Sequence, residues 1–178
     1  MFRRLFGRAA PPQPDTAAWW HEANALAQSP DVDRINALRT AICDAVSAPD
    51  IAEEQLEMIE GLERAHALSR LPALPVVATQ HRVIGQATCH FLAPASLIDQ
   101  VDVSGKLFAT GTALVFAPGA AGAVKQWPWH SVSAVARVAR DVVIDQRGQP
   151  SAARLRMNTM GDALVAVALA ERLRPNRP

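Results

Sequence analysis

The sequence predicts an α+β protein: an N-terminal helical arm, then a seven-stranded β-sandwich or partial barrel that a C-terminal helix closes. Three observations support this order. Apolar residues recur at helical spacing before residue 70, short β-branched runs alternate with Gly and Pro after residue 76, and an apolar helix ends the chain. With 178 residues, 49% of them hydrophobic, the chain is long enough to bury a substantial core.

Residues 1–14 are expected to be a flexible basic N-terminus followed by a proline-rich spacer. In a helix, three apolar side chains would share one face with three arginines around it: Phe2, Leu5, Phe6, Arg3, Arg4 and Arg8. One interpretation is a frayed terminus. The other is a weak foot on an anionic membrane surface, for which these six residues would be the contact.

Residues 15–72 are expected to form the helical arm, with helices over residues 16–28, 32–47 and 50–70. Prolines at positions 30 and 49 separate the three helices. Asp50 and Glu53 have the spacing of a capping box at the start of the third helix. Two apolar stripes would need to be buried: Ile35, Leu38, Ile42 and Val46, and Leu56, Ile59 and Leu62.

Residues 76–174 are expected to form the β-rich domain. Its seven strands are predicted over residues 86–93, 105–110, 112–117, 123–127, 132–138, 141–146 and 152–157. A helix over residues 160–173 should follow, with Thr159 as its cap and Asp162 at the acidic capping-box position. We expect this helix to plug one open end of the sandwich with Leu164, Val167, Ala168 and Leu173.

The order of seven strands and one helix resembles a pleckstrin-homology-like (PH-like) domain, and one stretch resembles the GRAM type of it. The residues that match the pattern "G-x-L-x-x-T-x-x-x-L-x-F" are Gly105, Leu107, Thr110, Leu114 and Phe116. The resemblance covers roughly residues 80–174, and the arm resembles the N-terminal extension of bacterial PH/GRAM-like proteins. It implies a binding module rather than an enzyme.

PH-like domains that bind phosphoinositides usually concentrate basic residues on the first two strands and the loop between them. Here that loop is expected over residues 94–104, where Asp99 and Asp102 stand and no basic residue does. Lys106 follows alone. These charges would repel a phosphorylated headgroup, so specific phosphoinositide binding is not expected.

The charge distribution bears on the class of partner, and the cysteine content bears on the cellular compartment. Residues 1–14 carry a net +3, residues 15–70 a net −7 and residues 71–178 a net +5, with no concentrated basic surface of the kind that binds nucleic acid. Two cysteines in a chain of this length favour a reducing compartment. We therefore expect a cytoplasmic protein, with a peripheral position at the inner membrane face as the alternative.

No residue pattern indicates a catalytic, cofactor or metal site. The chain has no G-x-S-x-G elbow, phosphate-binding loop or H-E-x-x-H motif, and His81, His90 and His130 follow no ligand spacing. Cys89 and His90 are strand neighbours and should point to opposite faces. Four arginines are expected either to face water from strands or to form a basic patch: Arg137, Arg140, Arg154 and Arg156.

Trp127 and Trp129 are the candidate partner-binding residues, because tryptophan is enriched at interface hot spots, although core packing is the alternative for either. The sequence thus favours a non-enzymatic binding or adaptor module that recognises a protein segment or a second copy of itself. The alternatives are a peripheral membrane adaptor and, more remotely, an enzyme with an unrecognised site.

Overall fold

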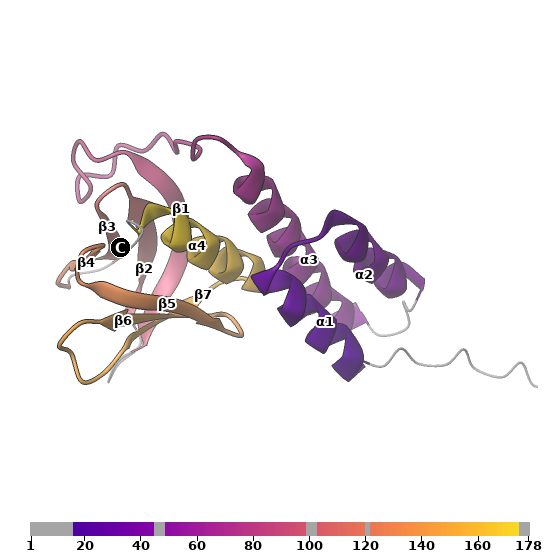
Figure 1. Cartoon of the computed structure of the whole chain (residues 1–178). Coiled ribbons are helices and arrows are strands. Elements are labelled where there is room, and N and C mark those ends of the chain that lie inside the picture. The colour runs from indigo at the N-terminus through magenta and orange to yellow at the C-terminus, as the bar shows by residue number, and fades with distance from the viewer. Residues whose placement is uncertain (1–15, 45–48, 99–102, 120–121, 175–178) are drawn as a thin grey trace, which may run out of the picture.

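The structure is a computed structural model that describes residues 16–44, 49–98, 103–119 and 122–174 (Figure 1). It has the predicted fold class: an N-terminal helical region, a seven-stranded antiparallel sheet that is not closed into a barrel, and a C-terminal helix, in a PH-like order. Figure 1 shows the C-terminal helix between the sheet and the helical arm.

The arm consists of α1 (Thr16–Gln28), α2 (Val32–Asp44) and α3 (Pro49–Arg70), close to the predicted ranges. Asp31 begins α2, where its side chain accepts a hydrogen bond from the Arg34 amide at 2.9 Å. Apolar side chains from all three helices form one core: Trp19, Ala23, Leu26, Ile35, Leu38, Ile42, Met58, Ile59, Leu62 and Ala65. Leu56, predicted in the apolar stripe, is instead exposed, and Val46 lies outside the described residues.

The sheet has the strand order β4-β3-β2-β1-β7-β6-β5, and neighbouring strands run antiparallel. The strands are β1 (Cys89–Ile98), β2 (Val103–Thr110), β3 (Ala113–Pro118), β4 (Lys125–Pro128), β5 (Val132–Val138), β6 (Asp141–Gln146) and β7 (Ala153–Met157). The bounds of β5 and β6 are those predicted. Strands β4 and β5 form the two edges of the sheet, because they stand at the two ends of the strand order.

The first strand was predicted incorrectly, because Pro94 was interpreted as the start of a loop. Strand β1 continues through Pro94 to Ile98. Pairing between β1 and β7 begins only at Ala95, so Pro94 has a neighbouring strand on its β2 side alone. A proline is tolerated at such an edge position, because its missing N–H is not needed by a second neighbour. Residues 94–98 and 103–104 of the expected loop are strand instead, and the remaining residues, which include Asp99 and Asp102, lie outside the described part of the chain.

Helix α4 (Met160–Leu173) has the predicted bounds and the predicted cap, since Thr159 Oγ1 accepts a hydrogen bond from the Asp162 amide at 2.9 Å. Its packing agrees with the prediction in part, since Val167 and Leu173 are partly buried against the sheet core as expected. The side chains that contact the sheet core are mainly Ala163, Val165, Ala166, Leu169 and Ala170. Leu164 and Ala168 pack into the arm core instead, because α4 is apolar on two sides and serves two cores.

The segment before β1 covers the other face of the sheet. Val77 and Val83 pack there against Ile84 and Phe108, and the Val77 amide donates to the Cys89 carbonyl at 2.8 Å. Burial raises the pKa of the Cys89 thiol, opposed by a smaller effect of its hydrogen bond to the Phe91 carbonyl. Cys89 is thus a packing residue on a strand that is covered on both sides.

Candidate functional site

The arm is fixed to the domain where α3 crosses α4 with two glycines in contact. A Cβ atom added to Gly61 would lie 2.5 Å from Gly161 Cα, so the helices approach more closely than any side chain would allow. Polar contacts flank the crossing: Glu57 Oε2 accepts from the Met160 amide at 3.1 Å, and Arg64 pairs with Asp162 at 3.0 Å. A carboxylate of the acidic arm therefore accepts a hydrogen bond from a backbone N–H at the N-terminal end of α4, where the helix dipole favours negative charge.

A groove of about 250 Å³ lies where the arm, the edge strand β5 and helix α4 meet. Its walls include Ala27 of α1, Val135 and Arg137 of β5, and Leu164, Ala168 and Glu171 of α4. The apolar side chains come from two core clusters that meet here. Arg137 and Glu171 are the two charged residues of this wall, with opposite signs.

Arg137 occupies an unusual place for an arginine. It shares a strand face with Val135, which is buried, and it pairs across the sheet with Val142, which is fully buried. Its guanidinium donates to the Ala139 carbonyl at 3.0 Å and to Asn24 Oδ1 of α1. Desolvation by burial lowers the pKa of Arg137, because the surroundings disfavour its charged form.

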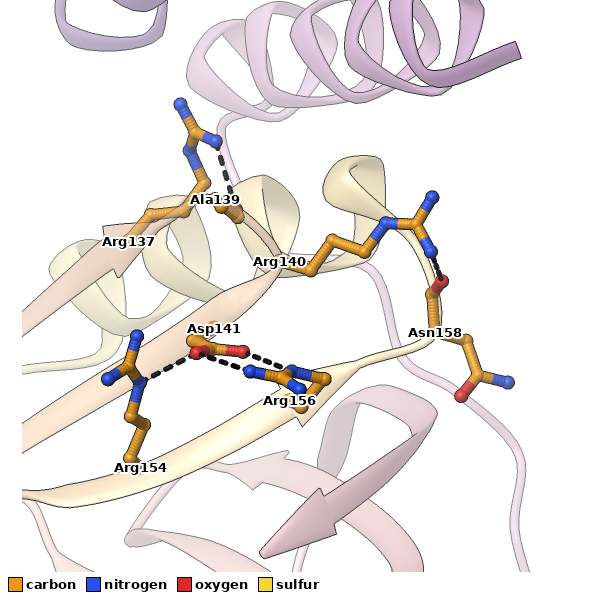
Figure 2. A network of polar contacts seen from close by, with 7 residues as sticks. All are labelled: Arg137, Ala139, Arg140, Asp141, Arg154, Arg156 and Asn158. Atoms are coloured by element: carbon orange, nitrogen blue, oxygen red, sulfur yellow. Dashed lines mark hydrogen bonds and ion pairs between the residues drawn. The ribbon is translucent and has the colours of Figure 1, made fainter. Parts of the chain in front are cut away.

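The other three arginines of this region pair with carboxylates, and Figure 2 shows the pairs that Arg154 and Arg156 form with Asp141. Arg154 and Arg156 hold Asp141 between them, at 2.6 Å and 3.0 Å. Arg140 donates to the Asn158 carbonyl at 3.3 Å and lies 3.4 Å from Glu57. The sequence left open whether these side chains face water or form a basic patch; they form ion pairs while remaining partly exposed.

Asp141 is itself buried, at 3% exposure. Burial alone would raise the pKa of this carboxyl, but the hydrogen bonds and charges of Arg156 and Arg154 outweigh it and hold the pKa below its usual value. Figure 2 shows the Arg137 side chain pointing away from this group, toward the opposite side of the strand. Asp141 therefore does not neutralise Arg137.

A second groove, of about 320 Å³, lies between α3, the segment before β1, and α4. Its walls are mostly apolar and include Leu68, Leu71, Phe91 and Leu169, with Arg64 and His90 among them. The His90 ring is held by its Nδ1 contact to the Pro75 carbonyl at 2.8 Å, and Arg64 already has Asp162. The side chains of His90 and Arg64 thus already contact other atoms of the chain.

Trp127 and Trp129, the candidate partner-binding residues, are both in the sheet core, at 4% and 5% exposure. The Trp129 indole also donates to the Thr110 carbonyl at 2.9 Å. An exposed aromatic anchor does not fit either residue, because both rings are buried in the sheet core. The candidate membrane residues, 1–8, lie outside the described residues.

Within the described ranges, no three His, Cys, Asp or Glu side chains are grouped to hold a metal ion. No helix in the same part of the chain has the length and apolar character needed to cross a bilayer.

The sequence singled out Arg137 only as a strand arginine that faces water or joins a basic patch, and its place in the groove wall was missed. The signal was present, because strict alternation from Val135 places residue 137 on the core face of β5. The contact that makes Arg137 part of a site could not be predicted, since Asn24 lies 113 residues away along the chain.

No protein-family model matches the chain, and no curated protein matches it in sequence. Among solved structures it is similar to the DH/PH domain of human ARHGEF11 in a complex with human RhoA, at 14% identity and a TM-score of 0.44, covering 88% of this chain and 53% of that chain. It is similar to the linker-DH/PH domains of p115-RhoGEF at 10% identity and a TM-score of 0.44, covering 91% and 56%.

A third similar structure is the C-terminal domain of an unknown protein from Leishmania infantum, at 12% identity and a TM-score of 0.44, covering 52% of this chain and 89% of that one. The chain spans about half the length of the two RhoGEF fragments.

Proposed function

We propose that this protein is a non-enzymatic binding module that holds an extended protein segment along the outer edge of β5. The observation that carries the proposal is the position of β5, which ends the strand order and has the groove of α1 and α4 beside it. An edge strand presents backbone N–H and C=O groups that an added strand can pair with.

Strand β5 is the better of the two edges for this purpose. It has seven residues, whereas β4 has four and ends in Pro128, which has no N–H to donate. Arg174 Nη1 donates to the Ser133 carbonyl at 2.8 Å and so occupies the beginning of β5. The part available for a bound segment is therefore residues 134–138.

The groove gives the bound segment a place for its side chains. Val135, Leu164 and Ala168 provide an apolar wall, and alternate side chains of an added strand would point toward it. The charged residues of the wall, Arg137 and Glu171, form neither a nucleophile–base pair nor a pair of carboxylates of the kind that catalysis uses. These features support binding rather than reaction.

The proposal can be tested by selecting peptides from a random display library with the full chain and measuring their dissociation constants by fluorescence anisotropy. Ala136 is exposed and lines the groove, so Ala136→Trp should weaken binding roughly tenfold or more by obstructing it. Ala152→Trp, at an exposed position before β7, is the matched control and should bind as the wild type does. Selection of no peptide, or equal weakening by both variants, would contradict the proposal.

A further inference from the structure

We propose that the segment bound along β5 carries an aspartate or glutamate whose carboxylate pairs with Arg137. This inference rests on the proposed function, because it names the chemistry that the same groove selects. It begins from an arginine placed on the core face of a strand, at a groove wall that the arm completes.

Arg137 forms no ion pair with a carboxylate of the described part of the chain, although Glu171 lines the same groove. Its hydrogen-bond partners there are two neutral oxygens, Asn24 Oδ1 and the Ala139 carbonyl. The neighbouring strand arginines differ, since Arg154 and Arg156 share the carboxylate of Asp141. Burial has removed part of the water around the Arg137 guanidinium, and no carboxylate among the described residues has replaced it. A ligand that brings a carboxylate would therefore stabilise the charged guanidinium.

The geometry of the guanidinium agrees with this assignment. Arg has five N–H donors in a planar fork, and the two neutral partners leave donors for an incoming group. Such a fork matches a carboxylate with two parallel hydrogen bonds. Desolvation, which lowers the pKa of Arg137, would be opposed by the bound negative charge.

Glu171 on the same wall limits the charge of the ligand. A phosphate group carries close to two negative charges at neutral pH, and Glu171 would repel it more strongly than a single carboxylate. The groove therefore fits one carboxylate near Arg137 and an apolar stretch along Val135 and Leu164. The ligand class is an extended peptide segment with a single acidic residue next to apolar ones.

The test is peptide selection from a random display library, carried out separately with the wild-type chain, Arg137→Gln and Arg147→Gln. Arg147 is an exposed arginine in the turn after β6 and serves as the matched control. We expect one position of the selected peptides to be enriched in Asp or Glu with the wild type and with Arg147→Gln, and to lose this enrichment with Arg137→Gln. Asn24→Ala, which removes the contact to the arm but keeps the guanidinium, should retain it.

A second measurement uses only the wild-type chain and so does not depend on how a variant folds. Replacing the enriched acid of a selected peptide by its amide should weaken binding roughly tenfold or more, because a hydrogen-bonded charge pair is lost. Peptides that bind without any acid preference, or that bind equally well as amides, would overturn this inference while leaving the proposed function standing. Selection of no peptide would overturn both, and enrichment in basic residues would overturn the carboxylate assignment alone.

Discussion

Replacing Gly61 by alanine should loosen the arm from the domain. The added Cβ would lie 2.5 Å from Gly161 Cα and 3.2 Å from the Gly161 carbonyl oxygen. Ordinary contacts begin near 3.4 Å, so α3 and α4 must separate by about 0.9 Å. A gap of that size removes a quarter to a half of the attraction at each affected contact, which includes Leu164 against the arm core.

The expected cost follows from two opposing effects. Overpacking of a tight contact costs about 1–3 kcal/mol, and the upper part of this range applies because the obstructing atoms are backbone. Alanine is a better helix former than glycine by about 1 kcal/mol, which offsets part of the loss. We therefore expect the free energy of unfolding of Gly61→Ala to fall by about 1–2 kcal/mol.

Urea denaturation of the full chain measures this change, and amide hydrogen exchange locates it. The Met160 amide, held by Glu57 across the same crossing, should exchange faster in Gly61→Ala. Gly111→Ala is the control, because nothing lies within 4 Å of a Cβ added there, and its stability should change by less than about 0.5 kcal/mol. A Gly61→Ala protein as stable as the wild type would refute the close crossing.

Three further predictions concern other parts of the chain. The lowered pKa of Asp141 contributes stability that is present above the ordinary carboxyl pKa of about 3.9 and is lost as the pH falls through the folded value. Asp141→Asn should therefore be less stable than the wild type near neutral pH and should lose less stability on acidification. Urea denaturation at several pH values measures both differences. Ala139 has a φ of 52°, in the left-handed region, so Ala139→Gly should hold or raise the thermal midpoint, and a clear fall would contradict the assigned turn. If residues 1–8 contact membranes, deleting them should abolish co-sedimentation with anionic vesicles at low salt; unchanged sedimentation would place any such contact on the domain.

The sequence predicted elements whose signals are local. Strand β6 and helix α4 were located correctly because alternation, a turn with glycine and the Thr159 cap all lie within a few residues of the bounds they set. Strand β1 was misplaced because the meaning of Pro94 depends on where the neighbouring strand β7 ends, at Met157, which is far from Pro94 in the sequence. From its sequence neighbours alone, a proline inside a strand cannot be distinguished from a proline in a loop.

The candidate site depends on contacts between distant parts of the chain, and the sequence could predict only some of its residues. Trp127 and Trp129 were plausible anchors because tryptophan is common both in cores and at interfaces, and only packing decides between them. The groove requires α1 to lie beside β5, through Asn24 and Arg137, and no local pattern specifies that contact. The apolar stripes of the arm predicted that it must pack, but not where.

The central claim is that a bound segment pairs with the outer edge of β5. Hydrogen exchange of the full chain with and without a selected peptide tests it most directly, because strand pairing slows the exchange of the amides that it binds. We predict that protection appears at residues 134–138 of β5 and spares β4 at the opposite edge of the sheet. Protection confined to β4, or to the groove between α3 and β1, would contradict the account.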